Sequence, residues 1–283
     1  MRKWIINILL VVFAGVFLVS GYFLMDYAII SRQQQNQYDE LAQLMAQAQQ
    51  VTPTRPAVTE PDPTEPEGTE EATEPTIDPN LVPVTDPQTG ETVYMLPEFT
   101  ELYLRNTDLV GWINIHNTKI NYPVVQSKDR VDYYLHRDFY GKDSAHGCIY
   151  VREQCDVFAP SDNLTIYGHR MRDGSMFRAL LNYQKKEFYD EHKYIQFSTL
   201  TEKHIYEVAY VFRTTATYKG FFYHLFVDAE NEADYQEFID SCQELSLYDT
   251  GITPVYGDKL ITLSTCEWSQ EDGRLVVVAK RVN

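Results

Sequence analysis

The sequence contains few cysteines and lacks the short motifs that most often mark a metal site, a nucleotide site or a hydrolase nucleophile. Four cysteines occur among 283 residues, and none belongs to a CxxC pair. There is no HExxH zinc pattern, no phosphate-binding glycine loop and no GxSxG elbow. We therefore expect no metal and no cofactor, so that any chemistry has to come from ordinary side chains.

The cysteines are also poorly placed for disulfides. On one extended strand, Cys148 and Cys155 would lie more than about 20 Å apart, whereas a bridge joins Cα atoms roughly 4.4–6.8 Å apart. Cys242 falls on the apolar face of a predicted helix and is expected to be core. Cys266 alone ends an apolar run, LITLSTC at 260–266, that opens into a polar turn. Its position leaves two interpretations open, a nucleophile or a packed thiol.

Basic residues are scarce between 51 and 100, where Arg55 is the only one. The same stretch holds ten of the thirteen prolines and eleven acidic residues against that one base, which gives ten of the seventeen net negative charges. Such a segment cannot bury enough apolar surface to offset its ordering entropy, and proline keeps it extended. Residues 51–96 are predicted to be a disordered acidic linker, and the acidity argues against a nucleic-acid partner.

Charged residues are absent from 4–25, an apolar run of 22 residues. At about 1.5 Å per residue it spans roughly 33 Å, enough to cross a hydrocarbon core of about 30 Å. Arg2 and Lys3 precede the run, so the N-terminus is predicted to be cytoplasmic and the later residues extracellular. A cleaved signal peptide, the alternative, would have an apolar region of only about 7–15 residues. We expect a single-pass cell-membrane anchor at 1–30, followed by a helical stalk at 31–50.

The remaining residues, 97–283, are about the size of one domain and are dominated by short apolar runs. Strands are predicted at 111–115, 120–126, 147–151, 163–168, 194–200, 205–216, 259–266 and 274–282. Helices are predicted at 97–107, 174–183 and, most clearly, 229–246. Many strands with few helices indicate a mainly-β barrel or sandwich rather than a βαβ sheet.

Two further residues with useful chemistry lie at the ends of predicted strands. His169 follows the run NLTIYG, and Arg274 begins the last strand eight residues after Cys266, a spacing that fits a hairpin. A thiol nucleophile needs a proton donor or base and an oxyanion stabiliser, and a guanidinium offers a fork of donors. The alternative for Arg274 is a surface arginine at a strand end. The other six histidines are expected to have surface roles.

Three separated segments resemble the sortases, membrane-anchored cysteine transpeptidases of Gram-positive bacteria. They are NLTIYGHRMRDGSMFRALLNYQ at 163–184, LITLSTCEW at 260–268 and GRLVVVAKRV at 273–282. Within that family, DLVGWINIHNTKINYPVVQ at 108–126 and the long helix near 229–246 resemble class B. The resemblance implies an eight-stranded β-barrel with an N-terminal helix, and it implies that Cys266, His169 and Arg274 lie together at one end.

The resemblance also implies a reaction. Cys266 would attack the Thr carbonyl of a C-terminal sorting signal similar to NPQTN or PPxTG and form a thioacyl enzyme. His169 would protonate the leaving amine and then deprotonate the incoming one, an amine of a peptidoglycan precursor, while Arg274 would hold the carbonyl or oxyanion. The backbone N–H of Glu267 would contribute to the oxyanion hole. The implied substrate-binding residues are Ser264, Thr265, Glu267, Thr215, Thr217 and Tyr223.

Three other functions were considered as alternatives. A cell-wall cysteine peptidase of the papain type would carry its nucleophile at the start of a helix, whereas Cys266 ends a strand. A pilin-polymerising sortase would carry a lid segment with an aromatic anchor, and no clear one is visible in the sequence. A non-catalytic surface adhesin on a long stalk would leave the Cys, His and Arg at three strand ends without a purpose.

One segment of the predicted linker, DPQTG at 86–90, itself resembles a class B sorting signal, with Asp where Asn, Ser or Pro is expected. A peptide on a flexible tether can reach an effective concentration of order millimolar, so the segment is a candidate pseudo-substrate. Asp-Pro and Thr-Gly are also ordinary turn-forming pairs. A simple turn is the alternative.

Overall fold

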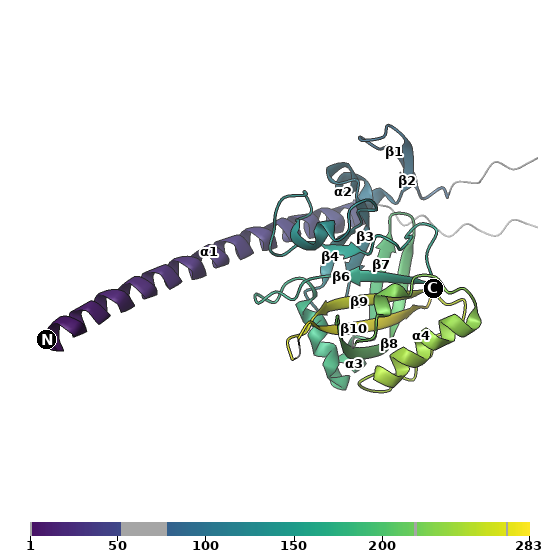
Figure 1. Ribbon diagram of the computed structural model, residues 1–283. Helices are drawn as coiled ribbons and strands as arrows, with labels where there is room; N and C mark the ends of the chain where they lie inside the picture. The colour runs from purple at the N-terminus through teal and green to yellow at the C-terminus, as the bar shows by residue number, and fades with distance from the viewer. Residues whose placement is uncertain (1, 52–77, 218–219, 270) are drawn as a thin grey trace, which may run out of the picture. The chain divides into compact units, whose positions relative to one another are not determined.

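The computed structural model describes residues 2–51, 78–217, 220–269 and 271–283. These residues form two compact units, Met1–Glu40 and Leu41–Asn283 (Figure 1). Helix α1 runs from Arg2 to Val51. Within the described ranges it is the one helix long and apolar enough to cross a membrane, over Ile6–Gln50. Its apolar side chains between residues 6 and 30 are exposed, as a segment surrounded by lipid requires.

Residues 82–95 form an antiparallel hairpin, with β1 at Val82–Thr85 and β2 at Thr92–Met95. This corrects the prediction of a disordered linker for the last part of 51–96. Val84 and Met95 are buried, so this part of the segment does bury apolar surface despite its proline content. Residues 52–77 of the predicted linker lie outside the described residues.

The DPQTG segment is the turn of that hairpin. The Asp86 carboxylate accepts hydrogen bonds from the Gln88 and Thr89 N–H groups (2.7 and 3.0 Å) and from the Tyr103 hydroxyl (2.5 Å). Gly90 has φ +76°, a conformation that glycine adopts without strain. The simple-turn interpretation is therefore the one that the structure shows.

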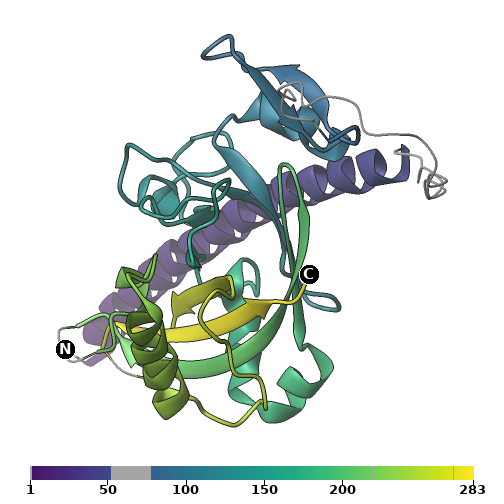
Figure 2. The same ribbon diagram turned by 90° about the vertical axis from the view of Figure 1, so that its right-hand side faces the viewer.

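Eight strands between residues 109 and 281 form a closed barrel, which confirms the predicted fold (Figures 1 and 2). The strand order is β10-β8-β7-β3-β4-β5-β6-β9, in which β4–β5 and β6–β9 are parallel pairs and the other pairs are antiparallel. The strands are β3 Leu109–Asn114, β4 Asn121–Val125, β5 Ile149–Val151, β6 Asn163–Tyr167, β7 Tyr194–Thr199, β8 Lys203–Thr215, β9 Leu260–Cys266 and β10 Gly273–Arg281.

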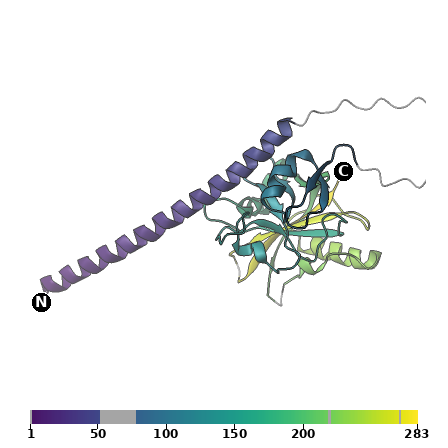
Figure 3. The same ribbon diagram turned by 90° about the horizontal axis from the view of Figure 1, so that it is seen from above.

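Short helices connect the strands, and one longer helix, α4, lies along one side of the barrel (Figure 3). Asn231 caps α4 by accepting from the Ala233 and Asp234 N–H groups. Tyr235, Phe238, Ile239 and Cys242 form its buried face against β8 and β10. The helical elements of the domain are η1 Pro97–Phe99, α2 Thr100–Arg105, η2 Tyr133–His136, η3 Phe177–Gln184, α3 Lys186–Glu191, η4 Tyr223–Leu225 and α4 Glu232–Leu245.

The interior of the barrel is apolar and closely packed. Side chains from its strands, among them Ile113, Val124, Ile166, Leu263 and Val277, have no exposed surface. Burying a side chain of this size stabilises the fold by roughly 1.5–3 kcal/mol. Because the core and the closed hydrogen-bond ladder fix every strand, residues at the strand ends are held on a rigid frame.

Candidate active site

Cys266 and Arg274 are brought together by the β9–β10 hairpin. They are directly paired in the antiparallel register, and residues paired in this way project from the same face with Cβ atoms about 4.5–5.5 Å apart. Arg274 Nη1 donates to the carbonyls of Asp272 and Gly273 (3.1 and 3.0 Å). Among the described residues both of its hydrogen bonds use Nη1, so Nη2 and Nε remain available to a ligand.

His169 reaches the same level from the neighbouring strand. β6 runs parallel to β9 with Tyr167 beside Ser264, so His169, two residues on, lies level with Cys266. Gly168 permits this path, because a Cβ there would lie 2.7 Å from the Phe177 ring. The chain then turns, and the Phe177 N–H donates to the His169 carbonyl (2.9 Å).

The His169 ring is held by a backbone carbonyl. Its Nε2 lies 2.6 Å from Leu135 O. A carbonyl only accepts, so Nε2 carries the proton and Nδ1 is left to gain or lose one. Burial lowers the pKa of His169 below its ordinary value, the bond to Leu135 raises it, and the nearby His136 and His146 lower it further. The imidazole is therefore mainly neutral at neutral pH.

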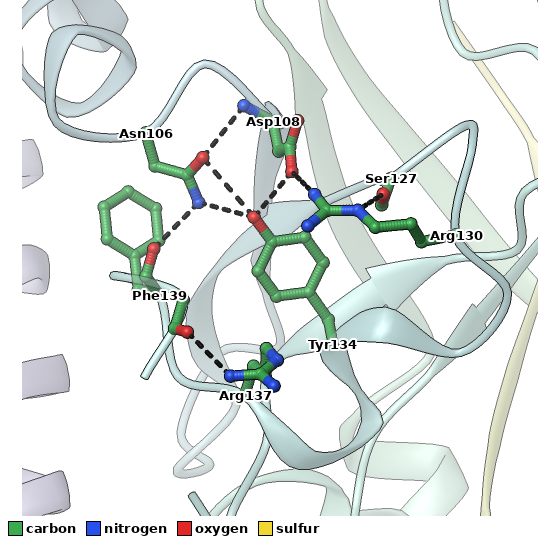
Figure 4. Close-up of polar contacts among 8 residues, drawn as sticks. Asn106, Asp108, Ser127, Arg130, Tyr134, Arg137 and Phe139 are labelled. Atoms are coloured by element: carbon green, nitrogen blue, oxygen red, sulfur yellow. Dashed lines mark hydrogen bonds and ion pairs between the residues drawn. The ribbon is translucent and has the colours of Figure 1, made fainter. Parts of the chain in front are cut away.

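A partly buried polar cluster fixes the helix that carries Leu135 (Figure 4). The Tyr134 hydroxyl donates to Asp108 Oδ2 (2.8 Å) and accepts from Asn106 Nδ2 (3.0 Å). Arg130 bonds both Ser127 Oγ (3.1 Å) and Asp108 Oδ2 (3.4 Å). Burial raises the pKa of Tyr134, so it stays a neutral donor. We call Asn106, Asp108 and Tyr134 the η2 clamp, because they anchor η2 to the start of β3.

Cys266, His169 and Arg274 line one pocket of about 220 Å³. Ser264, Thr265 and Tyr223, three of the predicted substrate-binding residues, also line it. The Tyr223 hydroxyl lies 2.6 Å from Ser264 Oγ, and burial raises the pKa of this tyrosine. Thr265 Oγ1 is buried and has no hydrogen-bond partner among the residues that the structure describes. Ser264 lies two residues before Cys266 on β9, so the Tyr223–Ser264 pair lies on the same face of the strand as the thiol.

The other predicted substrate-binding residues lie at the edge of this arrangement. Thr215 Oγ1 donates to Glu271 O (2.9 Å) and lies 3.2 Å from Thr217 Oγ1, while Ala216 between them lines the pocket. The Glu267 N–H donates to Gly273 O (2.8 Å). This corrects the expected oxyanion role of Glu267, since its N–H is already part of the β9–β10 ladder.

Several pocket residues had not been predicted. Tyr167 lies two positions before His169, and residues two apart along a strand lie on the same face. This spacing could have predicted Tyr167 as a pocket residue. Tyr150 donates to Asp132 Oδ1 (2.8 Å), and burial raises the pKa of Tyr150 and Tyr167. His224 also lines the pocket, and burial lowers its pKa. Leu135 contributes through its backbone, which no side-chain pattern reveals.

Two predictions about cysteine and histidine have definite outcomes. Cys148, Cys155 and Cys242 are buried free thiols, which confirms the core placement of Cys242. The expectation of surface histidines is wrong for His146, which is 2% exposed and whose Nε2 lies 3.0 Å from Asp173 Oδ2. Within the described ranges, no group of three or more His, Cys, Asp or Glu residues could hold a metal ion.

A thiol, an imidazole and a guanidinium at one end of a closed barrel define a candidate cysteine enzyme. Comparison with known proteins gives the family: a sortase domain matches residues 113–282. Sortase B of Staphylococcus aureus is 35% identical over 189 residues, covering 66% of this chain and 75% of that protein. Sortase B of Listeria monocytogenes is 33% identical over 187 residues, covering 65% and 74%.

A solved structure agrees with these relatives. The Staphylococcus aureus sortase B–substrate complex superposes with a TM-score of 0.70 at 28% identity, covering 90% of this chain and 99% of that chain. The chain belongs to the sortase family, and its curated relatives are class B members. Membership of the family supports a role as a transpeptidase in anchoring proteins to the cell wall.

Proposed function

We propose that the protein is a cysteine transpeptidase in which Cys266, His169 and Arg274 carry the reaction. Its substrate is the C-terminal sorting signal, similar to NPQTN or PPxTG, of secreted proteins, and its acceptor is an amine of a peptidoglycan precursor. The observation that carries the proposal is the pairing of Cys266 with Arg274 in a pocket that His169 also lines. An adhesin has no need for these three groups at one barrel end.

The first half of the reaction forms a thioacyl enzyme. The Cys266 thiol gives its proton to Nδ1 of the neutral His169, and the resulting thiolate attacks the carbonyl carbon of the signal's threonine. The free donors of Arg274 stabilise the developing oxyanion. As the intermediate collapses, the C–N bond breaks, and His169 gives a proton to the departing amine.

The second half reverses these roles. The acceptor amine attacks the thioester carbon, His169 takes the proton from the attacking nitrogen, and the C–S bond breaks to free Cys266. Because the Leu135 carbonyl accepts the hydrogen bond of Nε2, we assign every proton transfer of His169 in the two halves to its Nδ1. The lowered pKa of His169 favours the neutral form that accepts the proton in this half.

The arrangement of the chain fits this role. Residues 4–25 anchor the protein in the cell membrane with the N-terminus cytoplasmic and the catalytic domain extracellular, because Arg2 and Lys3 precede the span. In this proposal residues 31–50 extend the anchor as a stalk, and residues 97–283 carry the catalysis. The linker lets the domain reach both substrates near the membrane surface.

The proposal is tested with the full chain in an uncharged detergent. NPQTN- and PPxTG-like peptides are incubated with and without a glycine-based amine, and the products are identified by mass. We expect cleavage after Thr and, with the amine present, a product in which that Thr is joined to the amine. Cleavage without any transfer at saturating amine would indicate a hydrolase, and no cleavage of either peptide class would contradict the assigned substrate.

A further inference from the structure

A second pocket is lined in part by the loop that follows His169. Its volume is about 410 Å³. Lys119 comes from the β3–β4 connection, Arg172 from the loop and Arg178 from η3. The loop is closed at its base by a bridge between Arg170 and Met176. We call this site, defined by Lys119, Arg172 and Arg178, the basic pocket.

The positive charge of the basic pocket stands out against its surroundings. Residues 97–283 contain 28 acidic and 20 basic residues, a net charge of −8. One acidic residue, Asp173, also lines the pocket. Three cations around one cavity on an acidic domain create a local positive potential, which attracts anions.

The carboxylate of Asp173 is engaged elsewhere. Its Oδ1 accepts from the N–H and the hydroxyl of Ser175 (2.9 and 2.6 Å), and its Oδ2 lies 3.0 Å from His146 Nε2. Lys119 Nζ donates to the backbone carbonyl of Asp173 (3.3 Å). The single acid of the pocket thus braces the loop from inside through Ser175 and His146.

The two guanidinium groups have no acidic partner in the described part of the chain, where no ion pair includes Arg172 or Arg178. Arg178 lies close enough to Arg170 that its charge helps to lower the pKa of Arg170, after the larger effect of burial. Two planar donor forks and one ammonium thus face a solvent-filled cavity, and this is the chemistry that binds phosphate oxygens.

Trp268 connects the active site with the loop of the basic pocket, because two arginines of that loop lie near its ring. Trp268, two residues after Cys266, is 58% exposed. The Arg170 guanidinium lies 4.0 Å from the Trp268 ring centre, and that of Arg172 lies 5.9 Å away. A substrate whose amine is at Cys266 can pass over Trp268 and place a second group in the pocket.

We propose that the basic pocket binds a phosphate-type oxyanion carried by the acceptor substrate. This inference rests on the proposed function, because it assigns the acceptor a second point of contact. Three cations match a diphosphate, the group that would link a peptidoglycan precursor to a lipid carrier. A free diphosphate ion has the same chemistry, so the experiment separates the two sources.

Direct binding is measured with inorganic pyrophosphate and the full chain in an uncharged detergent, by calorimetry at fixed ionic strength. The variant is R172Q/R178Q, and the matched control is R281Q, which removes an arginine at the far end of β10. We expect pyrophosphate to bind the parent and the control with equal affinity. The double variant should bind at least about tenfold more weakly, which equals about 1.4 kcal/mol. Equal affinity in all three proteins, or no binding to the parent at millimolar pyrophosphate, would overturn the inference.

A transfer assay then identifies the source of the anion. Two acceptors with the same amine, one carrying a diphosphate and one lacking it, are compared in the parent and in R172Q/R178Q. We expect the variant to raise KM only for the diphosphate acceptor and to leave sorting-peptide cleavage unchanged. An equal change for both acceptors would contradict a contact with the acceptor's diphosphate. If no peptide is cleaved at all, the proposed function fails, while pyrophosphate binding still tests the pocket.

Discussion

Cys266 and Arg274 are direct cross-strand partners, at the last residue of β9 and the second residue of β10. Six further residue pairs continue the same ladder toward the other end of the barrel. The separation of the two residues' backbones is therefore set by the hydrogen bonds of the ladder, and Arg274 Nη1 is held further by the carbonyls of Asp272 and Gly273. Such preorganised donors cost no reorganisation when charge develops on a substrate oxygen.

Replacing Arg274 with Lys should lower kcat strongly. A lysine keeps the charge but loses the planar fork that can bond two atoms at once. Loss of one oxyanion donor typically lowers kcat by a factor of about 10²–10³, or roughly 2.7–4 kcal/mol. Steady-state kinetics on a sorting peptide measure the effect, with R281K as the control at the other end of β10. Unchanged kcat in R274K would reduce Arg274 to a structural residue.

The pH dependence of folding should report the buried state of His169. Its folded pKa lies below the ordinary value, so the unfolded chain binds more protons at mildly acidic pH. The resulting stability is complete above the unfolded pKa of about 6.5 and is lost as pH falls through that value toward the folded pKa. Denaturant titrations from neutral to acidic pH should show a shallower loss for H169Q than for the parent. Identical slopes would show that His169 is not desolvated.

The η2 clamp should act on catalysis through His169. In Y134F the hydroxyl that bonds Asp108 and Asn106 is lost, which should lower the free energy of unfolding by about 1–3 kcal/mol. If the Leu135 carbonyl then moves away from Nε2, the apparent pKa on the limb of the pH–rate profile that depends on His169 should shift. Y133F is the control, because the neighbouring Tyr133 packs its ring against Arg130 at 3.4 Å. A less stable Y134F protein with an unshifted profile would limit the clamp to a structural role.

The DPQTG turn should resist its own enzyme. Asp86 is held by Tyr103 and by two N–H groups of the turn, and these bonds lower its pKa. Intact mass of the full chain over a day should show no cut after Thr89. In D86N, hydrogen exchange of residues 82–95 should accelerate while the barrel is unaffected, with E91Q as the control in the same hairpin. Cleavage after Thr89 in the parent would restore the pseudo-substrate hypothesis.

The strands, and the placement of Cys266, His169 and Arg274 at strand ends, were predictable because each depends on local signals. Apolar runs predict the strands, and the seven residues between Cys266 and Arg274 fit a short hairpin. The bond from His169 to Leu135 spans 34 residues and ends on a backbone carbonyl, so no sequence pattern encodes it. The Glu267 N–H bonds Gly273 because the β9–β10 hydrogen bonds continue one residue past Cys266. The sequence does not show where this pairing stops.

The errors arose where tertiary contacts override local composition. The 82–95 hairpin was predicted as linker because the composition of 51–96 as a whole is acidic and rich in proline. That average conceals the few apolar residues that are buried, and it contains no information about the Asp86–Tyr103 bond. His146 was placed at the surface because its sequence neighbours are polar, while its partner Asp173 lies 27 residues away. A single sequence contains no local signal for either contact.

The most direct test of the account is to trap the acyl enzyme on Cys266. The full chain is mixed with a sorting peptide, quenched with acid and analysed by intact mass and peptide mapping. We expect an adduct on Cys266 in the parent and in C242A, whose lost thiol is buried in the core beneath α4. C266A should form no adduct and should neither cleave nor transfer the peptide, because no other group can form the thioester. Peptide cleavage or transfer by C266A at a rate near that of the parent would contradict the central claim.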